Sequence, residues 1–296
     1  MSEASERSIG ALIRDGGRSF SFEFFPPRDE DGERVLWQSI SELEALEPTF
    51  VSVTYGAGGA TRDRTVAITR RIAQETSMLP MAHLTCVGHT TAELAAVLRQ
   101  LTEAGVRNVL ALRGDAPGGP GSAWEATPDG LDYASDLVAF IKETADLTVG
   151  VAAFPEGHRD VASVDDDALV LKAKADAGAE FAVTEMVLRA SDYVGLVERA
   201  HALGVDFPII PGIMPILNLA SMRKMVELSG REIPDDVLGR ILPLQDDPAA
   251  LRAEGIAIAT ELCDALLEGG APGLHFYTLN RSKATREIYQ GLRTTV

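Results

Sequence analysis

The amino-acid sequence predicts a single-domain (β/α)8 barrel. Short apolar segments typical of strands alternate with longer amphipathic segments typical of helices, and we count eight such cycles. The chain has 296 residues, which suits a fold that typically needs about 250. No linker divides the eight cycles into two domains. We therefore expect residues 1–17 to form a polar leader, with a short helix around residues 11–13, and residues 18–296 to form the barrel.

The expected strands show little alternation of apolar and polar residues, as is usual for parallel strands that are covered on both faces. They are residues 19–25, 50–55, 81–86, 108–113, 148–154, 181–186, 208–214 and 274–279. An open, doubly wound sheet is the alternative. Its dinucleotide-binding form carries a G-x-G-x-x-G turn after the first strand. No such turn follows residue 25, and residues 56–60 (GAGGA) only begin the pattern, because Thr61 occupies the position of the third glycine.

The expected helices follow from apolar residues spaced three and four apart. The clearest covers residues 91–104, where Leu94 and Leu101 belong to one apolar face, and Thr90 and Glu93 are spaced as a capping box. The others are residues 33–46, 64–75, 133–144, 165–178, 192–203, 218–228, 235–242, 248–267 and 283–292.

Composition restricts the class of partner. The formal net charge is -17, and proteins that bind nucleic acids usually present a basic surface, so we expect no nucleic-acid partner. Two cysteines lie far apart in apolar segments, which favours a reducing compartment. The chain has no signal-peptide pattern and no apolar run of about 20 residues, so we expect a cytoplasmic protein without membrane contact.

The first expected strand carries a carboxylate between two aromatic residues. Glu23 lies between Phe22 and Phe24, and two prolines follow. In a central strand Glu23 would lie in low-dielectric surroundings, which raise the pKa of a carboxyl group. A carboxylic acid that stays protonated near neutral pH can act as a general acid. The alternative is an edge strand with Glu23 in solvent.

Further polar residues follow the expected strands, where a barrel has its active site. They are Thr54, Tyr55, Thr85, Arg113, Asp115, His158, Glu185, Tyr277 and Asn280, with His83 just inside its strand. His83, Cys86 and His89 have the spacing of metal ligands. Because strand residues three apart point to opposite faces, we expect no metal site there and a packed core thiol at Cys86.

Nine short segments together resemble the methylenetetrahydrofolate reductase family. They are residues 22–28 (FEFFPPR), 50–57 (FVSVTYGA), 62–65 (RDRT), 83–86 (HLTC), 111–115 (ALRGD), 133–136 (YASD), 151–156 (VAAFPE), 209–213 (IIPGI) and 275–281 (HFYTLNR). They occur in the family's order and cover nearly the whole catalytic domain. The resemblance implies a (β/α)8 barrel that normally holds FAD. It also implies reduction of 5,10-methylenetetrahydrofolate to 5-methyltetrahydrofolate by NADH or NADPH.

The resemblance also assigns roles to individual positions. Glu23 matches the general acid that helps to form the iminium at N5, and Asp115 matches the aspartate beside the pterin. Glu185 occupies the place of a glutamine that contacts the pterin, and Tyr277 is a further substrate-binding position. The cofactor-binding positions are Thr54, His83, Arg113, Tyr133, Ala152, Phe154, His158, Asp167 and Lys174.

Three positions depart from the flavin-binding pattern. Phe154 replaces a tyrosine, Val170 replaces an asparagine, and Ala173 replaces an arginine that helps to hold the phosphates of FAD. Losing one arginine–phosphate pair costs about 1.5–3 kcal/mol. We therefore expect no tightly bound FAD and direct hydride transfer from NAD(P)H to folate. The alternatives are a conventional FAD-dependent ping-pong enzyme and a non-catalytic folate-binding protein. The family forms homo-oligomers, and we expect a monomer if flavin is absent.

Overall fold

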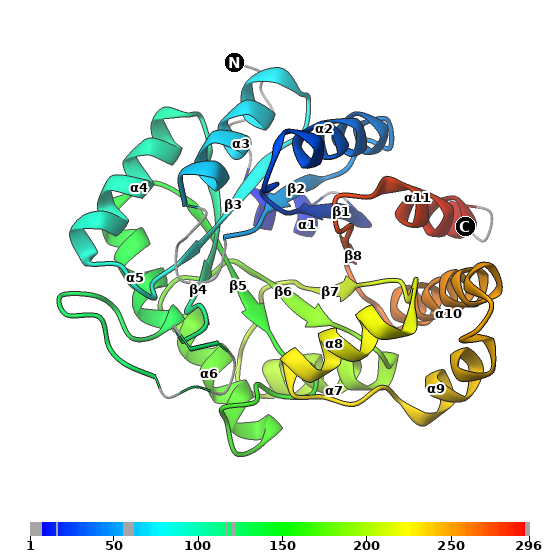
Figure 1. Cartoon of the computed structure of the whole chain (residues 1–296). Helices are drawn as coiled ribbons and strands as arrows, with labels where there is room; N and C mark the ends of the chain where they lie inside the picture. Colours follow the sequence, from blue (N-terminus) through cyan, green and yellow to red (C-terminus); the bar gives the residue numbers. More distant parts are fainter. Residues whose placement is uncertain are drawn as a thin grey trace.

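Eight parallel strands form a closed barrel in the order β1 to β8, which confirms the predicted fold class and excludes the open sheet (Figure 1). The computed structural model describes residues 8–15, 17–55, 62–116, 118–119, 122 and 124–293, so the glycine-rich segment 56–61 lies outside the described residues. The strands are β1 (Ser19–Phe24), β2 (Phe50–Val53), β3 (Pro80–Thr85), β4 (Asn108–Leu112), β5 (Thr148–Ala153), β6 (Phe181–Met186), β7 (Ile209–Ile213) and β8 (Gly273–Tyr277).

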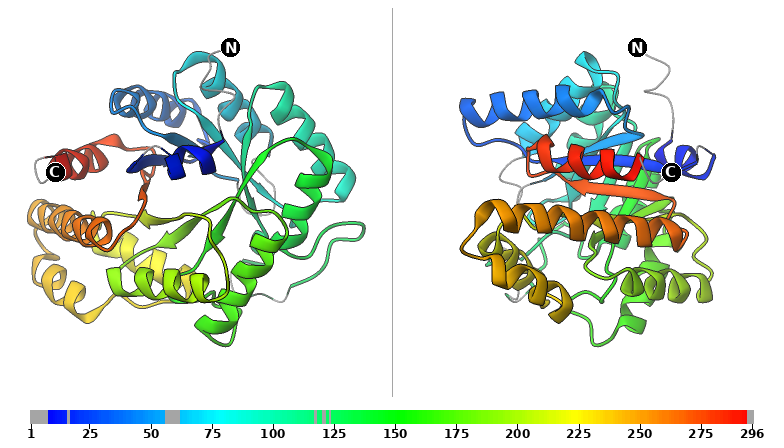
Figure 2. Two further views of the ribbon diagram at one scale, coloured as in Figure 1. Left: turned by 180° about the vertical axis from the view of Figure 1, so that it is seen from behind. Right: turned by 90° about the vertical axis from the view of Figure 1, so that its right-hand side faces the viewer.

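Helices surround the barrel, and their apolar faces cover the outside of the strands (Figures 1 and 2). They are α2 (Glu30–Glu44), α3 (Arg62–Glu75), α4 (Thr91–Glu103), α5 (Ala134–Thr144), α6 (Val164–Asp176), α7 (Ala190–Ala202), α8 (Leu219–Ser229), α9 (Asp235–Ile241), η3 (Leu242–Leu244), α10 (Pro248–Glu268) and α11 (Ser282–Arg293). The predicted capping box of α4 is present, because Thr90 and Glu93 exchange hydrogen bonds. Within the described residues no helix is long and apolar enough to cross a membrane.

A short helix, α1 (Ile9–Asp15), closes one end of the barrel and includes the predicted helical turn at residues 11–13. It is the dark blue helix at the edge of the right-hand view in Figure 2. Ile9 and Ile13 are buried against apolar side chains of the barrel interior, among them Phe50 and Phe181. The backbone N–H of Ile9 donates to the Asn108 side chain at 3.1 Å. The segment that looked like a polar leader thus contributes to the core.

Phe181 is expected to contribute strongly to stability. Its ring is fully buried, and its centroid lies 6.2 Å from that of Phe50. Phe181→Ala is expected to lower the free energy of unfolding by about 3–5 kcal/mol, because a large cavity would remain. Denaturant unfolding measures this loss. Leu169→Ala is the control, since Leu169 is 55% exposed and should change stability by less than about 0.5 kcal/mol. Equal stability of the two variants would contradict the prediction.

The strand register determines which side chains share the barrel mouth. Strand β1 pairs with β2 on one side and with β8 on the other, so Glu23 lies beside both Ser52 and Tyr277. Glu23 is only 6% exposed. The edge-strand alternative for Glu23 is therefore wrong, and the carboxyl group lies inside the barrel.

Candidate active site

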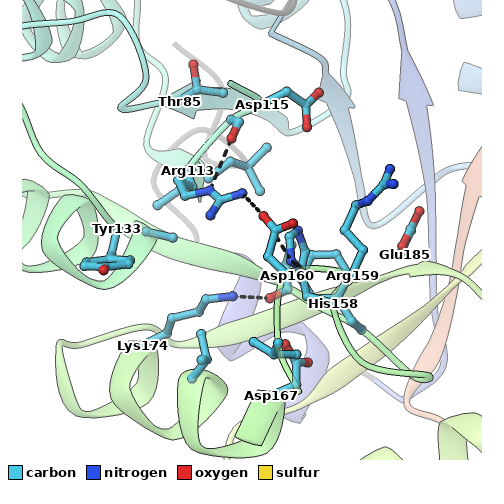
Figure 3. Close-up of a pocket in the computed structure, with 18 of the residues that line it drawn as sticks. Thr85, Arg113, Asp115, Tyr133, His158, Arg159, Asp160, Asp167, Lys174 and Glu185 are labelled. Carbon is cyan, nitrogen blue, oxygen red and sulfur yellow. Dashed lines mark hydrogen bonds and ion pairs between the residues drawn. The ribbon is translucent and has the colours of Figure 1, made fainter. Parts of the chain in front are cut away.

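A cavity of about 580 Å³ lies at the carboxyl ends of β4, β5 and β6 (Figure 3). Nine of the predicted site residues line it: Arg113, Asp115, Tyr133, Ala152, Phe154, His158, Asp167, Lys174 and Glu185. Four others, Glu23, Thr54, His83 and Tyr277, are not among its lining residues. The predicted site therefore consists of an open cavity and a more deeply buried group around Glu23.

The buried group is built from polar side chains of neighbouring strands. Oε2 of Glu23 lies 3.4 Å from Nε2 of His83 and 3.4 Å from Nε2 of His275. The Ser52 hydroxyl donates to the same oxygen at 3.4 Å. Burial lowers the pKa of His83, and the negative charge of Glu23 acts against this effect. Nε2 of His83 lacks hydrogen-bond geometry to Glu23, so His83 contacts the carboxyl group without a hydrogen bond.

His275 is held rigidly beside Glu23. Its Nδ1 is 2.7 Å from the Ser21 hydroxyl, and its ring stacks on Phe50 with the planes 14° apart. The side chain is 1% exposed. His275 belongs to a segment that carried the family resemblance, but its role beside Glu23 was not predicted. Its position four residues before the end of the predicted strand, near the strand's start, concealed it.

Tyr277 connects the buried group to the cavity. Its hydroxyl donates to the carbonyl oxygen of Thr184 at 2.5 Å. Burial raises the pKa of Tyr277 well above its usual value, and the carboxylates of Glu23 and Glu185 act in the same direction. Tyr277 therefore remains a neutral hydrogen-bond donor between these two carboxyl groups.

Asp115 reaches the cavity because of the glycine before it. Gly114 has a φ of 85°, and a Cβ atom there would lie 2.4 Å from Cγ1 of Val87. Only glycine allows the chain to turn so closely against the end of β3. The turn leaves Asp115 exposed at the cavity wall, where its carboxylate can face a cationic ligand.

Arg113 is already paired with an acidic residue. Its Nη2 lies 2.7 Å from Oδ2 of Asp160, and its guanidinium lies 4.9 Å from the centre of the Trp124 ring. Figure 3 shows Arg113, His158 and Asp160 on one side of the cavity. Burial lowers the pKa of His158, while Asp160 opposes this effect. The sequence reasoning missed Asp160, because it follows no strand directly and carries no motif.

Lys174 forms part of the cavity wall and is almost fully buried. It is 6% exposed, and its Nζ donates to the carbonyl oxygen of Ala152 at 2.8 Å. Burial lowers the pKa of Lys174 to about 8, although the nearby Asp167 raises it. Burial also raises the pKa of Asp167, and Lys174 opposes that change. The ammonium group lies 5.6 Å from the centre of the Phe154 ring.

The charged side chains lining the cavity do not suit a tightly bound FAD diphosphate. Among the described lining residues, Arg113, Arg159 and Lys174 are opposed by four carboxylates, those of Asp115, Asp160, Asp167 and Glu185. All three cations already donate hydrogen bonds to backbone carbonyls, Arg113 to Gly114, Arg159 to Leu228 and Lys174 to Ala152. Val170 and Ala173 line the cavity without offering a donor. A dianion is favoured by uncompensated cations, and the described side chains of this cavity carry more carboxylates than cations.

Two predicted positions, Thr54 and Tyr133, follow β2 and precede α5. The Thr54 N–H donates to the carbonyl oxygen of Phe24 at 2.9 Å at the end of β2. Tyr133 is 62% exposed at the start of α5.

His89 contacts the Tyr55 hydroxyl at 3.1 Å, while Cys86 is buried in the core. Among the described residues, no group of three or more His, Cys, Asp or Glu side chains could hold a metal ion.

Another residue that sequence reasoning missed is Arg231. It follows α8, outside any strand end, and its side chain is only 4% exposed. Its Nη2 lies 3.0 Å from Oε2 of Glu185, and its Nε lies 3.7 Å from Oε2 of Glu156. A charge that follows a helix in sequence is usually solvated, so no sequence signal marked it as part of the site.

The chain is similar to known proteins, to some in sequence and to others in fold alone. Residues 8–293 match the family model "Methylenetetrahydrofolate reductase". The chain is 40% identical to "5,10-methylenetetrahydrofolate reductase" of Escherichia coli, over 92% of this chain and 90% of that protein. It is 36% identical to "Methylenetetrahydrofolate reductase (NADH) 1" of Arabidopsis thaliana, over 96% of this chain and 50% of the relative. A Clostridium thermocellum structure, described as binding two copies of 5-methyl-5,6,7,8-tetrahydrofolic acid, has a TM-score of 0.67 at 14% identity. That match covers 97% of this chain and 99% of that chain and shows the shared fold.

Proposed function

Because the chain belongs to the methylenetetrahydrofolate reductase family, we propose that it reduces 5,10-methylenetetrahydrofolate with a hydride taken directly from NADH or NADPH. The family reduces methylenetetrahydrofolate, so the proposal concerns the hydride donor and the residues that act. The buried Glu23 network and the acidic cavity beside it support these roles.

Glu23 is proposed to start the reaction as a general acid. It donates its proton to N10 of the folate, the bond between N10 and the methylene carbon breaks, and the N5 iminium forms. The surrounding His83, His275 and Ser52 hold the carboxyl group in one place, which general acid catalysis requires. Solvent returns a proton to Glu23 after turnover.

Asp115 is proposed to stabilise the iminium. The hydride acceptor carries a positive charge, and a carboxylate at the cavity wall lowers the energy of that charge. The hydride from C4 of the nicotinamide then adds to the methylene carbon. This step converts the methylene group to a methyl group and NAD(P)H to NAD(P)⁺, so protons and electrons balance. A protein that only bound folate would gain nothing from a buried acid of this kind.

We propose that flavin is not a resident cofactor. The excess of carboxylates over cations among the described side chains of the cavity supports this. A flavoenzyme must hold FAD through many turnovers, whereas NAD(P)H leaves after each turnover and tolerates weaker phosphate contacts. The absorbance spectrum of the purified protein, measured beside an NADH oxidation assay with methylenetetrahydrofolate, tests this. We expect turnover, no flavin band and intersecting lines in two-substrate kinetics. A flavin band with parallel lines would establish the ping-pong alternative, and absence of turnover would favour the folate-binding alternative.

Dinucleotide binding is expected to weaken as the pH rises through about 8. Lys174 has its pKa lowered to about 8, so it is cationic below that pH and loses its positive charge above it. The negative phosphates of NAD(P)H are attracted only by the cationic form. We expect the KM for NAD(P)H to rise across this range.

Lys174→Met and Lys174→Arg provide the comparison. Below pH 8 the Met variant should show a KM about tenfold or more above the parent's, since it lacks the charge, and this KM should not change with pH. The Arg variant keeps its charge throughout and should flatten the profile. A parent KM that is the same on both sides of pH 8 would refute this role of Lys174.

A further inference from the structure

Arg231 brings a buried positive charge between two acidic residues of the barrel mouth. Its Nη1 donates to the carbonyl oxygen of Met186 at 3.1 Å, which fixes the guanidinium at the end of β6. Its Nη2 and Nε face Glu185 and Glu156 at 3.0 and 3.7 Å. Within the described part of the chain, neither Nε nor Nη2 has a partner with hydrogen-bond geometry. Arg231 thus acts on the two carboxylates mainly through charge, and their oxygens remain able to accept hydrogen bonds from a ligand.

The end of α8 directs Arg231 into the mouth. Gly230 ends the helix with a φ of 73°, in the left-handed region that favours glycine. The backbone N–H of Arg231 then donates to the carbonyl oxygen of Val226 at 2.8 Å. This reversal sends the side chain back towards β6. The residues just before it, Leu228 and Ser229, line the cavity, so Arg231 belongs to the same wall.

Four ionisable groups interact electrostatically with Glu185: Arg231, Glu156, Asp115 and Tyr277. Burial raises the pKa of Glu185, and the charges of Glu156 and Asp115 raise it further. Tyr277 is neutral, so Arg231 is the cation among these groups and the group that favours the carboxylate. Glu185 is 34% exposed in its side chain and lines the cavity, so it can touch a ligand.

The pterin ring of folate carries two adjacent donors on one edge, the 2-amino group and N3–H. A carboxylate can accept both donors side by side, whereas a protonated carboxyl group presents a competing donor. We propose that Arg231 is a positioning residue that keeps Glu185 as a carboxylate directed at the pterin, and that it thereby determines folate affinity rather than the rate of hydride transfer. This inference rests on the proposed function.

Arg231→Met tests the proposal through steady-state kinetics over a range of pH. With the cation gone, the pKa of Glu185 should rise further, so more of it is protonated at a given pH, and the KM for methylenetetrahydrofolate should rise about tenfold to a hundredfold with kcat little changed. As the pH rises, Glu185 ionises in the variant and its KM should fall back towards the parent value. The KM ratio of variant to parent should therefore shrink with increasing pH. A merely structural role of Arg231 would not produce this dependence.

Three further variants serve as comparisons. Arg231→Lys keeps the charge and should retain the parent's pH profile. The double variant Arg231→Met/Glu185→Gln has an amide that needs no cation, so its KM should not vary with pH relative to the parent. Arg189→Met removes a more exposed arginine, which pairs with Asp236 at 3.5 Å, and should leave both KM and kcat unchanged.

Glu156→Gln keeps the proposal testable even if Arg231→Met fails to fold. Without this carboxylate, the positive charge of Arg231 acts on Glu185 alone. The affinity for folate should therefore stay the same or improve. A raised KM in Glu156→Gln would overturn the proposal. A KM in Arg231→Met that equals the parent's, or that exceeds it by one factor at every pH, would also overturn it. A parent protein that does not turn over methylenetetrahydrofolate would instead refute the proposed function.

Discussion

Glu23→Gln is expected to lower kcat about 10²–10⁴-fold, because the variant keeps the shape of the side chain but cannot donate a proton. The affinity for methylenetetrahydrofolate should change much less, since glutamine keeps the size of the side chain and an oxygen that accepts hydrogen bonds. NADH oxidation at saturating folate measures kcat, and the folate dependence measures KM. The amide also interrupts the contacts with His83 and His275, so thermal unfolding must show that the variant is folded.

Ser52→Ala is the matched comparison for Glu23→Gln. It removes the hydroxyl that donates to Glu23 at 3.4 Å but leaves the carboxyl group in place. Its kcat should fall by about tenfold or less, the value of one neutral hydrogen bond. Turnover by Glu23→Gln at the parent rate would show that another group supplies the proton.

Deuterium placed at C4 of NADH is expected to appear fully in the methyl group of the product. Direct transfer moves the hydride from carbon to carbon, and neither position exchanges its hydrogen with water. A reduced flavin would carry the hydride on nitrogen, where hydrogen exchanges with solvent before the second step. NADH that carries two deuterium atoms at C4 avoids any dependence on which face reacts. Mass spectrometry of the 5-methyltetrahydrofolate product gives the result.

The complementary experiment uses unlabelled NADH in deuterated water. Direct transfer predicts a methyl group without deuterium, and a flavin route predicts substantial incorporation. Adding FAD to the assay should change neither outcome nor the rate. Deuterium in the methyl group from solvent would contradict direct transfer, whatever the absorbance spectrum showed.

The barrel could be predicted because each of its strands leaves a recognisable pattern within a short stretch of the sequence. Each runs for four to six mostly buried residues and is followed by a helix, the clearest of which has its apolar face between residues 91 and 104. Placing polar residues at strand ends then correctly gathered Arg113, Asp115 and Glu185 around one cavity. Cys86 lies just beyond the end of β3 in the core, and His83 lies beside Glu23.

Other features depend on contacts that no local pattern encodes. Arg231 reaches Glu185 because α8 ends in a tight reversal, and its sequence distance from β6 conceals the pairing. Asp160 pairs with Arg113 across a loop. Ile9 and Ile13 lie in a segment whose composition is polar, and only the three-dimensional barrel provides a surface for them. These contacts are tertiary, so propensity and periodicity cannot predict them.

The seam between β1 and β8 has a consequence for how the protein is made. Glu23 is enclosed by residues of β1, β2 and β3 and by His275 and Tyr277 of β8, more than 250 positions later in the chain. A ribosome releases the chain from its amino end, so the proposed acid remains without two of its neighbours until β8 has emerged. Closing so long a loop is slow. Activity should therefore arise in one late step during synthesis, and a nascent chain arrested before β8 should be inactive.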